Sequence, residues 1–358
     1  MGEIRVALAG IGSCASSLVQ AAEFVRLGSG AMNGIMYEHI GAYRVSDMRF
    51  VAAFDVDRRK VGLDLAKAIV APPVAAEIHV DVEPSGVSVE VGPLLDGVDG
   101  NLVDVIEPDP SSLETTVDDV AARLAVVEAD VLVCLLPTGA TQAVQAYARA
   151  AVQAGVAFIN ATPERVVHDP EIAAAFVSAG VPLLGDDLRS HLGATTLHTA
   201  LIELLKSRGL TVANTYQLNV GGNTDFLNLA DPKRAAGKMR TKRSALHTAG
   251  IDASSVSAGP NGFVEYLGDD KTCFIRIEAT SVLDSNLVLD VRMQVEDSPN
   301  AAGVLVNAVR VAKVAAEQGH VGSVDEVCAF LFKNPRVGAQ ESVGLRKFRE
   351  YVDAAARN

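Results

Sequence analysis

The chain has 358 residues, a formal net charge of −13, and a composition that is 49% apolar and 21% charged. This length exceeds the usual size of one hydrophobic core, so two domains are expected. The acidic excess disfavours nucleic acids and anionic membranes as partners, because both present polyanionic surfaces. Neither a signal segment nor an apolar run of about 20 residues is visible, which predicts a cytoplasmic protein.

The first part of the chain predicts a strand, a glycine turn and a helix. Residues 4–9 form an apolar run typical of a buried strand, and helical character follows from the turn to about residue 28. Residues 28–48 interrupt this pattern as an insertion before a second strand at 49–57. Residues 72–116 are rich in Pro, Val, Asp and Gly and are interpreted as strands and loops that form a lid or a sheet edge.

From residue 117 onward, short apolar strands alternate with helices, which is the pattern of a parallel sheet covered on both faces. The expected fold class is therefore α/β, with a Rossmann-type doubly wound parallel sheet. In chain order, the expected segments are helix 117–127, strand 129–137, helix 140–154, strand 156–160, helix 170–179 and strand 181–187.

The pattern changes after residue 193, which indicates an inserted α+β domain. A helix is expected at 194–207, and longer strands of alternating polarity follow it, as in a mixed or antiparallel sheet. A helical apolar stripe at 301–319 is expected to pack back on the first domain. The longer strands are expected at 215–220, 273–279 and 287–295.

Gly10, Gly12 and Ala15 form the pattern G-x-G-x-x-A between the first strand and the first helix. Gly10 permits a tight turn, Gly12 lets the backbone approach a pyrophosphate, and Ala15 allows close helix packing. A tight turn without a ligand is the weaker alternative in this context. Asp55 ends the second strand, where a carboxylate accepts bonds from an adenosine ribose and repels a 2′-phosphate. NAD is therefore favoured over NADP.

Three further segments leave sheet strands at their carboxyl ends, where open α/β sheets bind ligands. Segments 135–140 and 158–163 offer cofactor contacts, with ordinary loop residues as an equal alternative; the candidates are Thr138, Gly139, Asn160 and Thr162. The segment GDDLRSHLGAT at 185–195 joins two carboxylates to a helix start, where Ser190 and backbone amides can hold a phosphate. A simple helix cap is the alternative there.

Four long motifs run in series along the chain: GIGSCASSLVQ at 10–20, RFVAAFDVD at 49–57, LNVGGNTDFLNL at 218–229 and EDSPNAAG at 296–303. Together they resemble the myo-inositol-1-phosphate synthases of bacterial and archaeal type, and the similarity covers nearly the whole chain. The resemblance implies bound NAD, oxidation of D-glucose 6-phosphate at C5, aldol closure of the ring and reduction to 1D-myo-inositol 3-phosphate. It also implies a homotetramer.

The resemblance assigns NAD binding to residues 1–193 plus 296–358, and catalysis and tetramerisation to residues 194–295. The catalytic residues that it implies are Lys238, Lys242, Lys271, Lys333, Asp187 and Asp225. The implied substrate contacts are Ser190, His191, Leu192, Arg189, Asn219, Asn223 and Asp297. The implied cofactor contacts, together with those of the glycine motif, are Gly10, Gly12, Ser13, Cys14, Ala15, Asp55, Pro137, Thr138, Asn160, Thr162, Asp187, Asp297 and Ser298.

Lysines suit this chemistry because ammonium groups stabilise enolates and alkoxides, and burial or crowding lets one lysine act as a neutral base. Residues 233–243 contain six basic residues in eleven and, if helical, place Lys238 and Lys242 on one face. Without the resemblance, a solvated basic face is the preferred interpretation. With the resemblance, a phosphate between the two lysines is preferred, because it offsets their repulsion.

Two positions depart from the family pattern, since Arg189 replaces a common lysine and His191 replaces a glutamine. Arginine binds phosphate but does not readily exchange protons. His191 serves either as a phosphate donor or as a core or surface histidine. Two alternatives stay open: a cyclase that makes a five-membered ring from another sugar phosphate such as fructose 6-phosphate, and a non-catalytic NAD sensor or scaffold. A dehydrogenase that releases NADH lacks support, because the chemistry that the resemblance implies keeps the cofactor for a second hydride step. Asp187 and Asp297 leave metal dependence undecided.

Overall fold

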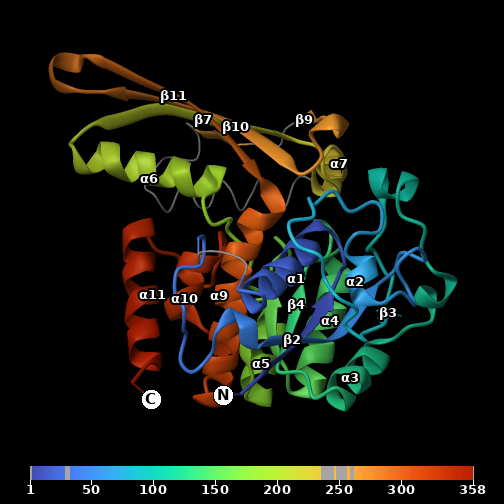
Figure 1. Ribbon diagram of the computed structural model, residues 1–358. Coiled ribbons are helices and arrows are strands. Elements are labelled where there is room, and N and C mark those ends of the chain that lie inside the picture. The colour runs from blue at the N-terminus through green and yellow to red at the C-terminus, as the bar shows by residue number, and fades with distance from the viewer. Residues whose placement is uncertain (1, 29–32, 235–245, 247–255, 259–261, 358) are drawn as a thin grey trace.

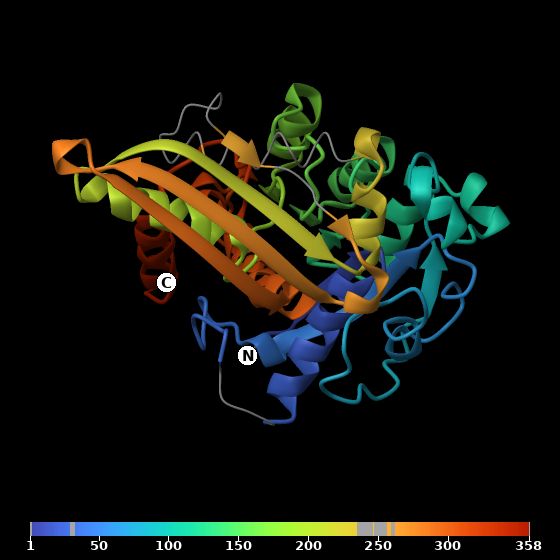
Figure 2. The same cartoon turned by 90° about the horizontal axis from the view of Figure 1, so that it is seen from above.

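The computed structural model describes residues 2–28, 33–234, 246, 256–258 and 262–357. Two sheets organise these residues, and Figures 1 and 2 show the second sheet lying across one end of the first, with the hairpin of its last two strands reaching beyond the body. None of the helices in the described ranges is long and apolar enough to cross a bilayer.

The first sheet confirms the predicted Rossmann-type fold. Its seven strands are parallel and run in the order β12-β6-β5-β4-β1-β2-β3, so the reversal of strand order falls between β1 and β4. In doubly wound sheets, ligands bind at the carboxyl ends of the strands beside this point. The strands are β1 (Ile4–Ala9), β2 (Met48–Asp55), β3 (Val89–Val91), β4 (Val131–Cys134), β5 (Ala157–Asn160), β6 (Pro182–Leu184) and β12 (Gly322–Ser323).

Helices cover both faces of this sheet because alternate side chains of each strand point to opposite faces. Ile4, Val6 and Leu8 of β1 pack with helices α1 (Ser13–Arg26), α9 (Asp297–Glu317), α10 (Asp325–Leu331) and α11 (Glu341–Ala355). Ala7 and Ala9 face helices α3 (Val117–Val126), α4 (Thr141–Ala154) and α5 (Pro170–Ala179). The return of α9 to the first domain confirms that expectation, whereas α10 and α11 were not predicted.

The second sheet is mixed, as the alternating pattern predicted. β10 (Asp270–Thr280) pairs antiparallel with both β7 (Thr211–Gly221) and β11 (Asn286–Glu296). The short strands β8 (Val256–Ala258) and β9 (Gly262–Phe263) run parallel to β7. Helix α6 (Ala194–Ser207) packs its apolar side on the inner face of this sheet, and the short helix α7 (Thr224–Leu229) follows β7. We propose, as the sequence predicted, that residues 194–295 form a domain inserted into the NAD-binding domain.

Both irregular segments of the first domain lie against regular structure. Within the insertion, the carbonyls of Tyr37 and Glu38 accept hydrogen bonds of 2.8 and 3.2 Å from the buried guanidinium of Arg310 in α9. The segment 72–116 contributes the edge strand β3, in agreement with its interpretation as a sheet edge. The short elements of these segments are η1 (Val45–Asp47), η2 (Gly100–Asp104) and η3 (Pro110–Leu113), and α2 (Leu65–Ala68) lies between the two segments.

Candidate active site

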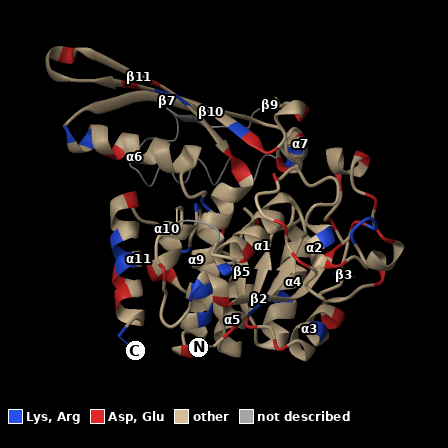
Figure 3. Ribbon diagram, viewed as in Figure 1, with Lys and Arg blue, Asp and Glu red and all other residues tan. Residues whose placement is uncertain are grey.

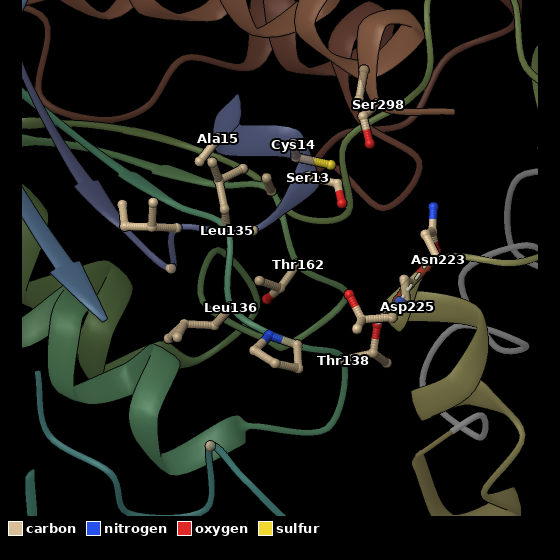
Figure 4. A pocket seen from close by; sticks show the side chains of 18 of the residues that line it. Ser13, Cys14, Ala15, Leu135, Leu136, Thr138, Thr162, Asn223, Asp225 and Ser298 are labelled. Atoms are coloured by element: carbon tan, nitrogen blue, oxygen red, sulfur yellow. Dashed lines mark hydrogen bonds between the residues drawn. The ribbon is translucent and has the colours of Figure 1, made fainter. Parts of the chain in front are cut away.

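A cavity of about 250 Å³ runs from the glycine turn of the first sheet to the near ends of β7 and β10. Figure 4 shows how it is bordered: Ser13, Cys14 and Ala15 lie on one side, Asn223 and Asp225 lie on the other, and Thr138, which follows β4, lies beside Asp225. A smaller hollow of about 30 Å³ adjoins it beneath the second sheet. The two spaces share four lining residues, Ser190, Asp225, Lys271 and Lys333.

The glycine turn has the conformation that its sequence predicts. Gly10 has a φ of +88°, and a Cβ at this position would lie 2.9 Å from the carbonyl oxygen of Leu135, so a side chain is excluded both by conformation and by space. A Cβ on Gly12 would meet nothing within 4 Å, because this residue faces the cavity at the start of α1. The turn can therefore admit a ligand's phosphates next to the backbone.

Asp55 connects the end of β2 to this turn. One carboxylate oxygen accepts a 2.7 Å hydrogen bond from the amide of Ile11, and the other accepts 2.7 and 2.9 Å bonds from the amides of Val56 and Asp57. Lys60 lies 4.0 Å from Asp55 and donates to the carbonyl of Ile11. Asp55 also lines the cavity, so its carboxylate both fixes the turn and borders the space where a ligand can bind.

The residues after β4 and β5 divide into two groups. Pro137, Thr138 and Thr162 line the cavity, whereas Gly139 and Asn160 are not among its lining residues. Asn160 is fully buried and donates 2.7 Å hydrogen bonds to Asp186 and to the carbonyl of Glu164. Burial raises the pKa of Asp186 to about 7, although the hydrogen bonds that this carboxylate accepts, the one from Asn160 among them, oppose the shift. Asn160 is thus placed to hold two loops together, rather than to contact a cofactor as expected.

Two of the four candidate lysines form matched pairs with carboxylates in the cavity. Lys271 Nζ lies 2.8 Å from Asp297 Oδ1, and Lys333 Nζ lies 2.8 Å from Asp187 Oδ1. Figure 3 shows basic and acidic segments together where β10 and β11 reach the first domain. Lys238 and Lys242 lie outside the described residues. The resemblance named these four residues singly, and the structure shows that they form two ion pairs whose partners are 26 and 146 residues apart.

Asp269, which the sequence did not single out, organises the start of α9. It is almost fully buried and accepts hydrogen bonds from the Ser298 hydroxyl at 2.7 Å, the Ser298 amide at 2.9 Å and the Asn223 side chain at 3.2 Å. Burial raises the pKa of Asp269, against these hydrogen bonds. Asn223 in turn caps α7 by accepting from the amides of Asp225 and Phe226. The Asp269 carboxylate therefore joins its own segment to the starts of α7 and α9, which line the cavity.

The smaller hollow has polar, charged and apolar residues in its lining. It lies between the amino-terminal turn of α6 and the inner face of β7. Five of its lining residues were among the predicted site residues: Ser190, Asn219, Asp225, Lys271 and Lys333. The other lining residues were not predicted: Gly193, Ala194, Thr195, Thr196, Gln217, Phe226 and Leu229.

Three predicted substrate residues do not line either space. Arg189 is buried, donates to the carbonyl of Phe332 and forms an ion pair with Glu341 at the start of α11. The structure therefore assigns Arg189 to holding the loop before α6, in place of the phosphate contact expected from sequence. The amide and carbonyl of Leu192 bond to the Asn300 side chain, and His191 packs beside Gly303 with its amide bonded to the Asn300 carbonyl.

Metal ligation finds no support in these groups. Among the described residues, no cluster of three or more His, Cys, Asp or Glu side chains is arranged to hold a metal ion. Asp187 and Asp297 instead face lysines, so the charges that would attract a cation are already partnered.

The fold and this cleft define a Rossmann-type α/β protein with a second, mixed sheet that closes its ligand site. The myo-inositol-1-phosphate synthase sequence profile matches residues 193–298. Inositol-3-phosphate synthase of Mycolicibacterium smegmatis is 41% identical, with 98% of each chain covered. The chain belongs to the myo-inositol-1-phosphate synthase family.

Solved structures agree with this assignment. The crystal structure of Ari2 is similar with a TM-score of 0.80, 37% identity and 99% of each chain covered. The structure of a myo-inositol-1-phosphate synthase-related protein from Thermotoga maritima has a TM-score of 0.85, 26% identity and 98% coverage of each chain. Both similarities span the two sheets, because they cover nearly the whole length.

Proposed function

We propose that this protein is an NAD-dependent sugar-phosphate cyclase that converts D-glucose 6-phosphate into 1D-myo-inositol 3-phosphate. The observation that carries the proposal is the pair of lysine–carboxylate contacts, Lys271–Asp297 and Lys333–Asp187, at the boundary between the larger cavity and the polar hollow. Family membership and the inositol-3-phosphate synthases among its relatives support the same activity.

The larger cavity fits NAD. Gly10, Gly12 and the start of α1 offer backbone amides and open space for a pyrophosphate, and Asp55 offers a carboxylate for ribose hydroxyls. Apolar side chains of Val98, Leu102 and Ile106 continue the lining beyond Asp55 and suit an adenine ring. When bound, NAD would accept a hydride from the sugar and return it later.

The lysines supply the proton transfers that this reaction needs. Oxidation of the C5 alcohol requires its hydroxyl proton to leave, and enolisation requires loss of a proton from C6. The enolate then forms the bond to the C1 aldehyde, whose oxygen becomes an alkoxide and must gain a proton. Lys271 and Lys333 can stabilise these negative charges, and their carboxylate partners hold the ammonium groups in place. Lys238 and Lys242 are proposed to join them on the strength of the resemblance.

A second cyclase function, formation of a five-membered ring from fructose 6-phosphate, is favoured by one observation: both departures from the family pattern, Arg189 and His191, flank Ser190 in the loop before α6. A non-catalytic NAD sensor would not need the lysine pairs. A dehydrogenase would not need acid and base groups for ring closure.

The exposed side of the second sheet supports the proposed homotetramer. Tyr216, Leu218, Phe274 and Val288 are each between 37% and 46% exposed on neighbouring strands. Leu218 and Phe274 lie opposite each other on β7 and β10, whereas the charged residues Arg276 and Glu278 of β10 lie opposite Tyr216 and Val288. Exposed apolar side chains with polar residues around them are typical of interaction surfaces. A cytoplasmic location remains part of the same proposal.

The test of this function is incubation of the purified protein and NAD with glucose 6-phosphate and fructose 6-phosphate, followed by identification of the products. A six-membered cyclitol phosphate from glucose 6-phosphate supports the first function, and a five-membered product from fructose 6-phosphate supports the second. Accumulation of NADH in proportion to consumed sugar contradicts both, because ring closure between two hydride transfers is redox-neutral.

A further inference from the structure

A buried lysine lies beside the carboxylate that is proposed to hold the adenosine ribose. Lys60 follows β2 in a tight turn, in which the amides of Lys60 and Val61 donate to the carbonyl of Asp57. Lys60 is 3% exposed and lines the same cavity as Asp55, yet it was not among the predicted site residues. The cofactor side of the cavity therefore contains a buried positive charge.

The ammonium group of Lys60 lies between the glycine turn and Asp55. Nζ donates a 2.6 Å hydrogen bond to the carbonyl of Ile11 and lies 4.0 Å from Asp55 Oδ2, which is an ion pair but not a hydrogen bond. Asp55 and Ile11 both line the cavity. A ribose oxygen that contacts Asp55 Oδ2 at the usual hydrogen-bond distance of about 2.8 Å would therefore lie within about 7 Å of Nζ.

Lys60 offsets the negative charge that Asp55 brings to this part of the cavity. The carboxylate accepts hydrogen bonds from three backbone amides, which are neutral donors and leave its charge in place. The nearby Asp57 is already paired with Arg59, whose Nε lies 2.9 Å from Asp57 Oδ1. The formal charge at the ribose position is therefore set by Asp55 and Lys60, and the two charges cancel. The other charged residues that line the cavity belong to the substrate side: Asp187, Asp225, Lys271, Asp297 and Lys333.

We propose that Lys60 is a specificity-determining residue of the cofactor site, because its ammonium group attracts the 2′-phosphate of NADP and narrows the preference for NAD that Asp55 creates. A ribose hydroxyl is neutral and responds weakly to either charge, whereas a 2′-phosphate is repelled by the carboxylate and attracted by the ammonium group. NAD stays preferred, since a hydroxyl can donate to Asp55 and a phosphate dianion cannot. The inference rests on the proposed use of NAD and adds NADP as a second, weaker cofactor.

The test measures the dissociation constants of NAD and NADP by calorimetry and compares their ratio between variants. Loss of the Ile11 contact weakens both cofactors alike, because both carry the same pyrophosphate, so this effect cancels in the ratio. In Lys60→Met, which keeps a long apolar side chain without the charge, the preference for NAD should widen by about tenfold. Lys60→Arg keeps the charge and should keep most of the native ratio. Lys67→Met removes an exposed charge on α2 and should leave the ratio unchanged.

The same substitution in an Asp55→Ala background separates a direct effect from an indirect one. Direct attraction of the phosphate predicts that Lys60→Met still widens the preference for NAD by about tenfold, although the carboxylate is gone. An effect that disappears in this background would show that Lys60 only positions Asp55, and would overturn the inference.

An unchanged ratio in Lys60→Met, or no measurable binding of NADP by the native protein, would overturn the inference as well. If Lys60→Met does not fold, Lys60→Gln removes the same charge and serves the same comparison. Failure of the native protein to bind either cofactor would instead overturn the proposed function, and the inference with it.

Discussion

The two halves of the cleft are built in different ways. On the cofactor side, the contacts leave neighbouring parallel strands at one edge of a single sheet: Gly10 follows β1, Asp55 ends β2 and Thr138 follows β4. On the substrate side, side chains meet from α6, β7, β10 and the starts of distant helices, and Lys333 reaches Asp187 across 146 positions of sequence.

The cofactor side of the cleft would recognise its ligand mainly through the backbone, whereas the substrate side would act mainly through side chains. The cofactor side depends on a turn conformation and on strand order, which a local motif can specify. The substrate side depends on pairs of charged or polar side chains that only the tertiary fold brings together. Changes to one half should therefore affect cofactor affinity, and changes to the other half should affect turnover.

The largest effect is expected from Lys333→Ala. Loss of this ammonium group should reduce kcat by about 10²- to 10⁴-fold, the usual contribution of one acid or base, while the affinity for NAD changes little. Lys238→Ala is expected to behave in the same way on the basis of the resemblance. Steady-state rates and NAD titrations measure the two quantities. Lys67→Ala, an exposed lysine of α2, is the control, and near-normal turnover in Lys333→Ala would remove this residue from the chemistry.

The substrate half should also respond to acid. Burial lowers the pKa of His198 to about 4 from an ordinary value of 6.5, so the unfolded chain binds a proton in this interval that the folded chain does not. The contribution of the neutral ring is present above pH 6.5 and is lost as the pH falls toward 4, by up to about 3 kcal/mol. Denaturant unfolding of the native protein and of His198→Phe at several pH values measures the free energy of unfolding as a function of pH. An equal loss of stability between pH 6.5 and 4 in the two proteins would contradict this prediction.

Substitution of the two glycines of the turn should affect stability and NAD affinity differently. Gly10→Ala forces a Cβ into contact with the Leu135 carbonyl at a positive φ, so stability should fall by about 1–3 kcal/mol and NAD should bind more weakly. Gly12→Ala has free space and should fold normally, yet it should still weaken NAD by closing the backbone to the pyrophosphate. Thermal unfolding and NAD titration measure both, and normal NAD affinity in Gly12→Ala would place the pyrophosphate elsewhere.

Asp55→Ala should weaken NAD by about tenfold, as expected for loss of charge-assisted hydrogen bonds, and should narrow the preference for NAD over NADP. Removal of the carboxylate also frees the amide of Ile11, so part of the loss comes from the turn. Asp55→Asn keeps an acceptor and should be affected less. An unchanged NAD to NADP ratio in Asp55→Ala would show that the carboxylate does not face the ribose.

The smallest effect is expected from His191→Gln. The ring packs beside Gly303, does not line the hollow, and has its pKa lowered by burial, so KM should change by no more than about twofold and the pH profile of KM should keep its shape. A KM profile that flattens near neutrality in the variant would restore His191 as a phosphate donor. New turnover of glucose 6-phosphate in the variant alone would favour the five-membered-ring function.

The sequence predicted features that have a local signal and missed those that depend on distant partners. The glycine turn, Asp55, the parallel sheet and the alternating strands all follow from short-range patterns. Arg189 was expected at a phosphate, but Glu341, which pairs with it, lies on a helix that was not predicted. Asp269 occupies a position that looks ordinary in sequence, and its role depends on Ser298, which lies 29 residues further along the chain.

In the proposed reaction, bound NAD would take a hydride from C5 of the sugar and return it to the same carbon after ring closure. Glucose 6-phosphate that carries deuterium at C5 tests this directly, with catalytic amounts of NAD and analysis of the product by mass spectrometry and NMR. We expect a carbocyclic phosphate that retains the deuterium on the carbon that was C5, with no accumulation of reduced cofactor. Loss of the label to solvent, or its recovery in released NADH, would show that the hydride is not returned.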